Sequence, residues 1–162
     1  AVCGECPHRP LLAKINNVAP CYVNLGQAPN GVYRSEYPNG VPTIKKPLRL
    51  GAYGEPTALP FELVQDAVNN ADGHTGYTHQ WRTCDPRFKT LLMASVDSIG
   101  EQIEAQAQGW RTFRVRKETD ALMDGEIQCP ASKWGGFKTN CAKCGLCAGT
   151  SRDAKSVSEV EH

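Results

Sequence analysis

The chain has 162 residues, of which 40% are hydrophobic and 22% are charged. This length and composition predict one soluble globular domain with a sizeable core, and they exclude collagen, coiled coil and wholesale disorder. Lys and Arg number 18 against 17 Asp and Glu, so the chain lacks the basic excess that is typical of nucleic-acid-binding modules. No run of about 18 uncharged apolar residues predicts a membrane span.

The predicted elements suggest a central α/β core between two cysteine-containing segments. Prolines interrupt residues 1–47, which are expected to be irregular. In chain order, strands are predicted over residues 47–53, 75–81, 90–96, 111–115 and 126–128, with one helix over 60–68 and another between Ser98 and Gly109. Residues 129–149 form a cysteine-rich segment, and residues 150–162 are predicted to be a polar tail.

The second helix carries the clearest local signal. Ser98 and Glu101 match a capping box at its start, and Gly109 is placed as its stop. Ile99 and Ile103 occupy helical spacing and predict its buried face. Strand, helix and strand follow within thirty residues, so we expect four or five parallel strands. The predicted fold is α/β, either a partial (β/α) barrel or a small open parallel sheet, in one metal-binding domain over residues 1–149.

Eight cysteines dominate the chemistry of the sequence. Four of them, Cys129, Cys141, Cys144 and Cys147, contain the tandem C-x2-C-x2-C spacing that is typical of iron–sulfur ligation rather than of a zinc ribbon. Disulfides are the alternative. Because no signal peptide is recognisable, we expect a reducing, cytoplasmic compartment, which disfavours disulfides. Zinc, or a cluster that only staples the fold, is the other alternative.

A second set of cysteines lies in the first half of the chain. Cys3, Cys6 and Cys21 are predicted to supply three ligands, and Cys84 is either the fourth or a plain buried residue. With three protein ligands, a [4Fe-4S] cluster keeps one iron open for a small molecule. His8 is an alternative ligand. One or two clusters are therefore expected.

Polar residues follow several predicted strands. Ligands of parallel α/β proteins bind outside the carboxyl ends of the strands. The candidate catalytic residues there are Glu55, His79, Asp97 and Arg114, with His79 as proton donor or acceptor. Each has a structural alternative: a turn cap for Glu55, a half-buried histidine, a turn residue for Asp97, and a solvent-facing or charge-neutralising Arg114.

Several motifs together resemble a family of cysteine-rich proteins from bacteriophages and prophages that has no established activity. They are residues 3–7 (CGECP), 21–24 (CYVN), 76–81 (GYTHQW), 93–98 (MASVDS), 109–115 (GWRTFRV) and 129–132 (CPAS). The resemblance spans residues 3 to about 149 and implies the cytoplasm of an infected host cell. A more distant likeness is to the partial barrel of radical-SAM enzymes. Their C-x3-C-x2-C spacing is replaced here by C-x2-C-x14-C, so no residue that contacts S-adenosylmethionine is inferred.

Two functions follow from these patterns. The first is a phage-encoded [4Fe-4S] redox or radical-type enzyme that acts on a small molecule. The alternative is a non-catalytic module, stabilised by zinc or a cluster, that binds a host protein or nucleic acid. For nucleic acid, which is not favoured, the candidate patch is Trp110, Arg111, Arg114, Arg116 and Lys117.

Overall fold

The computed structural model describes residues 3–4, 6–17, 21, 31, 34, 43 and 45–161. Within these residues, no helix has the length and apolar character needed to cross a membrane. The segment before residue 47, predicted to be irregular, contains the short helix α1 (Pro10–Asn16).

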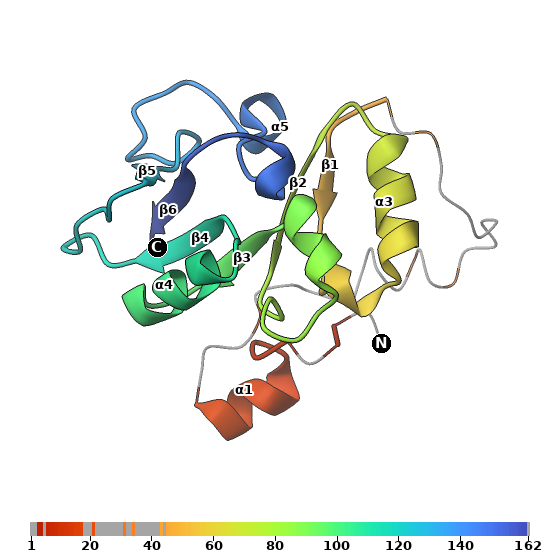
Figure 1. The fold of residues 1–162 in the computed structure, drawn as a ribbon, viewed down its shortest axis with the longest axis horizontal. Coiled ribbons are helices and arrows are strands. Elements are labelled where there is room, and N and C mark those ends of the chain that lie inside the picture. Colours follow the sequence, from red (N-terminus) through yellow and green to blue (C-terminus); the bar gives the residue numbers. More distant parts are fainter. Residues whose placement is uncertain are drawn as a thin grey trace.

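Six parallel strands form one open sheet in the order β1-β2-β3-β4-β6-β5 (Figure 1). The strands are β1 (Leu48–Leu50), β2 (His74–Thr78), β3 (Met93–Val96), β4 (Thr112–Arg116), β5 (Glu126–Gln128) and β6 (Ser156–Val160). The predicted α/β class is confirmed, and the open parallel sheet is the alternative that the structure adopts. Because β6 lies between β4 and β5, the strand order is not the sequential one of a (β/α) barrel.

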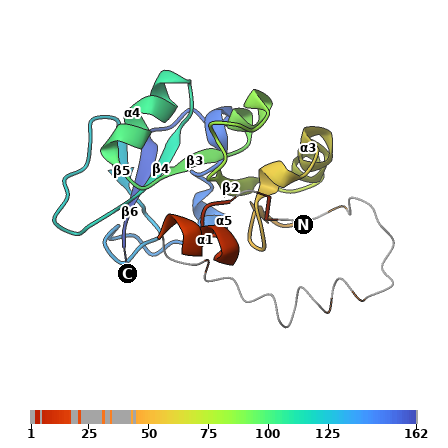
Figure 2. The same cartoon turned by 90° about the horizontal axis from the view of Figure 1, so that it is seen from below.

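Helices cover both faces of this sheet. On one side lie α3 (Phe61–Asn69) and α4 (Ile99–Ala107), and on the other lies α5 (Cys141–Cys144) (Figure 2). Three short 3₁₀ helices, η1 (Pro56–Ala58), η2 (Pro86–Thr90) and η3 (Gly149–Ser151), complete the described elements. Because both faces are covered, β3 is buried at every position, as expected for a central parallel strand.

The core under α3 and α4 is apolar. Val64 of α3, Phe88 of η2 and Leu92 beside β3 belong to one buried cluster that also contains Trp81 and Trp110. Val64 is the buried residue of α3. Trp81 is 3% exposed, so it fills the core and does not stack on a ligand.

The predicted apolar face of α4 is wrong. Ile99 and Ile103 are 49% and 56% exposed, whereas Gln102 and Ala105 are fully buried. The predicted cap is correct, since the Ser98 hydroxyl accepts a hydrogen bond from Glu101 N at 3.2 Å. Two charged residues lie near this buried glutamine.

Those charged residues are Arg114 of β4 and Glu126 of β5. The Arg114 guanidinium donates hydrogen bonds of 2.9 and 2.7 Å to the two carboxylate oxygens of Glu126. Both residues are buried, and Gln102 is among the groups that lower the pKa of Glu126. Gln102 therefore lies close to a buried carboxylate, although neither its amide nitrogen nor its amide oxygen has a partner in hydrogen-bonding geometry among the described residues.

The predicted polar tail is the second correction, because residues 156–160 form the interior strand β6. Val157 and Ser158 are both completely buried, and Ser156 and Val160 are nearly so. Small serines allow the strand to sit between two neighbours, and they satisfy local groups: the Ser158 hydroxyl donates to Arg114 O at 3.1 Å. The sequence did not predict this strand because serine is polar, but Ser156 and Ser158 are small enough to be buried between the neighbouring strands.

Candidate metal centres

The N-terminal cysteine turn docks at the carboxyl end of β2. Cys6 N donates to Cys3 O at 3.1 Å, and the Arg9 guanidinium donates to Gly4 O at 2.9 Å. Gly4 has φ +48°, and a Cβ there would lie 2.8 Å from the side chain of Gln80. The positive φ of the turn therefore favours glycine here, and the turn lies against the Gln80 side chain that follows β2.

Three thiols gather around this turn. Cys21 joins it through its backbone N–H, which donates to His8 O at 2.8 Å. Burial raises the pKa of the Cys6 thiol, against a backbone hydrogen bond from His8 that lowers it. The charges of Glu55, Cys21 and Cys3 raise that pKa further. The predicted ligands Cys3, Cys6 and Cys21 therefore lie in one neighbourhood, with a carboxylate beside them.

Glu55 ties that neighbourhood to the sheet. It is 4% exposed and caps η1, where its Oε1 accepts from Thr57 N at 3.3 Å and from Thr57 Oγ1 at 3.0 Å. Its Oε2 accepts from His79 N at 3.2 Å. The turn-cap alternative is confirmed, and the same carboxylate also fixes the backbone that carries His79.

His79 is the side chain that meets the cysteine turn. Its Nδ1 lies 4.0 Å from the Sγ of Cys6, and its ring packs against that of His8, with centroids 4.6 Å apart. Burial, followed by the charge of His8, lowers the pKa of His79 to about 4, and the charges of Asp97 and Glu101 oppose this shift. The imidazole is therefore neutral near pH 7 and offers a lone pair to a proton or a metal.

Asp97 completes the arrangement. Its Oδ2 lies 3.9 Å from His8 Nε2. Among the described residues, two groups of ligand-type side chains have donor atoms that all lie within 4.8 Å of one another: Cys6 with Glu55 and His79, and His8 with His79 and Asp97. The structure thus brings together three of the four predicted catalytic residues, and it adds His8 to them.

Arg114 is not part of this arrangement. Its guanidinium is engaged by Glu126 and by Ala121 O, and the residue is 2% exposed. A catalytic role for this buried, fully engaged side chain is therefore not supported. The position of Arg114 on a strand could be predicted from the sequence, but the direction of its side chain could not. The structural role differs from both alternatives suggested by the sequence.

Cys84, the proposed fourth ligand, packs against the hydrophobic cluster under α3 and α4. Burial, followed by the charge of Glu55, raises the pKa of its thiol to about 11. Cys84 is partly buried, and the charge of Glu55 acts on it as it acts on Cys6, so its role as fourth ligand stays a prediction.

The four C-terminal cysteines lie against the opposite face of the sheet. Cys147 packs with Met93 and Val157, and Cys129 lies at the border of the same cluster. Burial raises the pKa of Cys147 to about 11, and the charges of Cys141 and Cys144 contribute to that rise. The four thiols predicted to form one centre therefore occupy one region.

Tyr77 joins this region from β2. A hydrogen bond between its hydroxyl and the Cys147 thiol lowers the pKa of the thiol, against the larger effect of burial. Burial, followed by the charge of Cys147, raises the pKa of Tyr77, so the phenol stays protonated and can donate to a thiolate. The sequence places Tyr77 near the end of a strand, but it does not show that the side chain lies on the face that carries Cys147.

Arg111 anchors the cysteine-rich segment. Its Nη1 donates to the carbonyls of Leu146 and Gly149 at 2.9 and 2.7 Å, and its Nη2 donates to Lys155 O at 2.6 Å. Gly76 N donates to Cys147 O at 2.9 Å, which joins the segment to β2. Backbone contacts of this kind hold the loop on the sheet independently of any metal.

Most residues of the candidate nucleic-acid patch are buried or hydrogen-bonded within the protein. Trp110 is 5% exposed, Arg111 and Arg114 are bonded as described, and the Arg116 guanidinium donates to the carbonyls of Lys117 and Asp120 and to Gln128 Oε1. The residues do not present one basic, aromatic surface.

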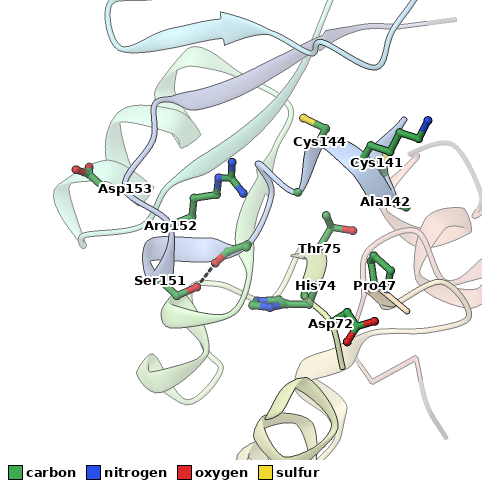
Figure 3. A pocket seen from close by; sticks show the side chains of 14 residues that line it. Pro47, Asp72, His74, Thr75, Cys141, Ala142, Cys144, Ser151, Arg152 and Asp153 are labelled. Carbon is green, nitrogen blue, oxygen red and sulfur yellow. Dashed lines mark hydrogen bonds between the residues drawn. The ribbon is translucent and has the colours of Figure 1, made fainter. Parts of the chain in front are cut away.

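A cavity of about 550 Å³ adjoins the C-terminal cysteines at the amino-terminal edge of β2 (Figure 3). Its lining includes Cys141, Cys144, His74 and Arg152. A guanidinium nitrogen of Arg152 lies 3.3 Å from where a Cβ on Gly145 would be, so this cation is beside α5. The expected ligand position was the carboxyl edge; this cavity opens at the opposite edge.

No protein-family model, no curated protein and no solved structure matches the chain. The resemblance to phage proteins and to radical-SAM enzymes therefore remains an expectation from the motifs. The two candidate metal-binding groups, by contrast, rest on the distances between their donor atoms.

Proposed function

We propose that the chain is an iron–sulfur protein, and that the thiols of Cys3, Cys6 and Cys21 hold a [4Fe-4S] cluster whose fourth iron is open to a small-molecule substrate. The supporting observation is the 4.0 Å approach of the Cys6 thiol to His79 at the carboxyl end of β2. Three thiols around a polar, partly exposed group suit a cluster that reacts, whereas four thiols around an apolar group suit one that only stabilises the fold.

The donor set fits such a cluster. Three thiols come from a glycine-containing turn and from Cys21 beside it, and the backbone supplies N–H groups close to sulfur, as in other thiolate sites. The cluster would supply one-electron chemistry at the open iron. The chain's own residues would position the substrate and exchange protons with it.

Among these residues, His79 is the proton acceptor. Its low pKa keeps it neutral at physiological pH, and burial limits its access to water. Glu55 holds the backbone of His79, and Asp97 on the exposed side of the group is placed to contact a polar substrate.

For the C-terminal cysteines, we propose a second centre, an iron–sulfur cluster or a zinc ion. Its role would be to fasten the loop over the apolar face formed by Met93, Phe113 and Val157. The motif resemblance favours a phage protein that works in the host cytoplasm.

Iron counting in cysteine variants tests the assignment. After anaerobic reconstitution with iron and sulfide, Cys6→Ser is expected to lose about four irons per chain relative to wild type. Cys84→Ser, the matched control, is expected to keep the wild-type iron content. Equal losses in both variants would make Cys84 a ligand and contradict a three-thiolate centre.

Cyanide tests the open iron. An iron without a protein ligand can bind this small anion, so cyanide is expected to shift the EPR spectrum of the reduced wild-type protein. A Cys6→Ser protein that keeps only the C-terminal centre is expected to show no shift. An unshifted wild-type spectrum would favour the alternative function, a cluster- or zinc-stabilised binding module.

A further inference from the structure

We propose that His8, His79 and Asp97 form a binding site for one divalent cation, which adjoins the N-terminal thiols and uses none of the cysteines as a ligand. The three side chains come from the N-terminal turn, the end of β2 and the end of β3. Two imidazoles and one carboxylate, with further positions open, are the ligand set of mononuclear iron(II) sites and also suit manganese and zinc. The proposal goes beyond the iron–sulfur assignment and does not depend on it.

The distances allow the site to close. The donor atoms all lie within 4.8 Å of one another, and His8 Nε2 is 3.9 Å from Asp97 Oδ2. Neighbouring ligand atoms at about 2.1 Å from one ion lie about 3 Å apart. Each pair therefore has to approach by less than about 2 Å, which small side-chain rotations achieve.

The three proposed ligands differ in their exposure to solvent. The side chains of His8 and Asp97 are 27% and 58% exposed, so both reach the solvent side of the group. His79 is half-buried, and its backbone N–H donates to Glu55 Oε2 at 3.2 Å. Because Asp97 and His8 lie on the exposed side, a bound ion would keep that side open to water or substrate.

The helix cap positions the carboxylate. Asp97 N donates to Glu101 Oε2 at 2.9 Å, and the other Glu101 oxygen accepts from the Arg82 guanidinium at 3.2 Å. The capping box of α4 therefore does more than start a helix: it fixes the backbone of a residue that ends β3. The charge of Glu101 also reaches His79, which adds negative potential where a cation would bind.

Manganese is the probe that separates this site from the thiolates. Imidazole and carboxylate ligands suit Mn²⁺, whereas thiolates prefer zinc, copper(I) and iron–sulfur clusters. Binding is followed through the EPR signal of free Mn²⁺, which falls as the ion binds to the protein.

The wild-type chain is expected to bind one Mn²⁺. Asp97→Asn and His8→Gln are each expected to weaken binding by at least tenfold, as loss of one of three ligands should. Asp72→Asn, which removes an exposed carboxylate at the opposite edge of the sheet, is the matched control and is expected to bind as wild type. Because Asp97 is exposed, its substitution leaves the core intact, and equal thermal midpoints confirm this.

Two results would overturn the site: no binding of Mn²⁺ by the wild-type chain, or equal binding by Asp97→Asn and wild type. Iron and sulfide content, measured on the same variants, separates this outcome from the iron–sulfur proposal. That content depends on the cysteines, and it is expected to be unchanged in Asp97→Asn.

Discussion

The guanidinium of Arg114 on β4 reaches past the interior strand β6 and pairs with the carboxylate of Glu126 on β5. The ion pair is completely enclosed: the two side chains are 2% and 0% exposed. Burial of such a pair costs solvation energy, which the hydrogen bonds between the two partners offset. Removal of one partner leaves the other as an uncompensated buried charge.

Glu126→Gln is therefore expected to lower the free energy of unfolding by about 3–5 kcal/mol. Urea denaturation followed by circular dichroism measures this loss. Glu62→Gln is the matched control, because Glu62 pairs with Arg87 on the surface, and it is expected to leave the midpoint almost unchanged. Similar midpoints for the two variants would show that the Arg114–Glu126 pair contributes no more than a surface one.

The low pKa of His79 predicts acid sensitivity of the metal-free protein. The folded state binds the proton only near pH 4, whereas the unfolded chain binds it at about 6.5. Stability from this residue is therefore complete above pH 6.5 and falls as the pH decreases toward 4, by about 3 kcal/mol.

Urea midpoints at pH 7 and pH 4, for wild type and for His79→Gln, measure this effect. The variant is expected to lose less stability between the two pH values. Burial also lowers the pKa of His74, so some acid sensitivity should remain in the variant. An identical pH dependence in both proteins would show that His79 is not buried as a neutral imidazole.

In the metal-free, reduced protein, the thiol of Cys141 is expected to react faster than the thiols of Cys129 and Cys147. Cys141 is exposed at the rim of the cavity, whereas Cys147 is 7% exposed. Burial raises the pKa of Cys147 to about 11 and, with the Glu159 hydrogen bond, that of Cys129 to about 12. Only thiolates react readily, so Cys141 is expected to be alkylated faster by about tenfold or more.

Timed labelling with iodoacetamide, followed by peptide mass spectrometry, measures these rates. A urea-unfolded sample is the control, in which the four cysteines should react alike. If Cys147 reacts as fast as Cys141 in the folded protein, the loop does not pack on the sheet as the structure shows.

Local patterns were sufficient to predict most of this fold. The buried run before Asp97 and the Ser98 capping box define β3 and the start of α4 with little help from the rest of the chain. Strand β6 could not be recognised, because Ser156 and Ser158 look polar in sequence and become buried only through their neighbours. The inner face of α4 was misassigned for the same reason: Gln102 faces an ion pair that only the sheet order assembles.

Some residues of the candidate site could be predicted from the sequence, and others could not. Strand ends predicted His79, Asp97 and Glu55 correctly as neighbours, since the carboxyl ends of parallel strands share one edge. The same rule placed Arg114 there, although its long side chain extends under the helix instead. His8 carried a usable signal, because it lies two residues after Cys6 in the same turn, but only the tertiary packing brings it against His79.

The most direct test of the iron–sulfur proposal is the metal and sulfide content of the wild-type protein after anaerobic purification, together with its absorption spectrum. The proposal predicts a brown protein with a broad band near about 400 nm and about four or eight irons per chain, matched by sulfide. A colourless protein with about one or two zinc ions and no sulfide would contradict it and would instead indicate a zinc-stabilised binding module.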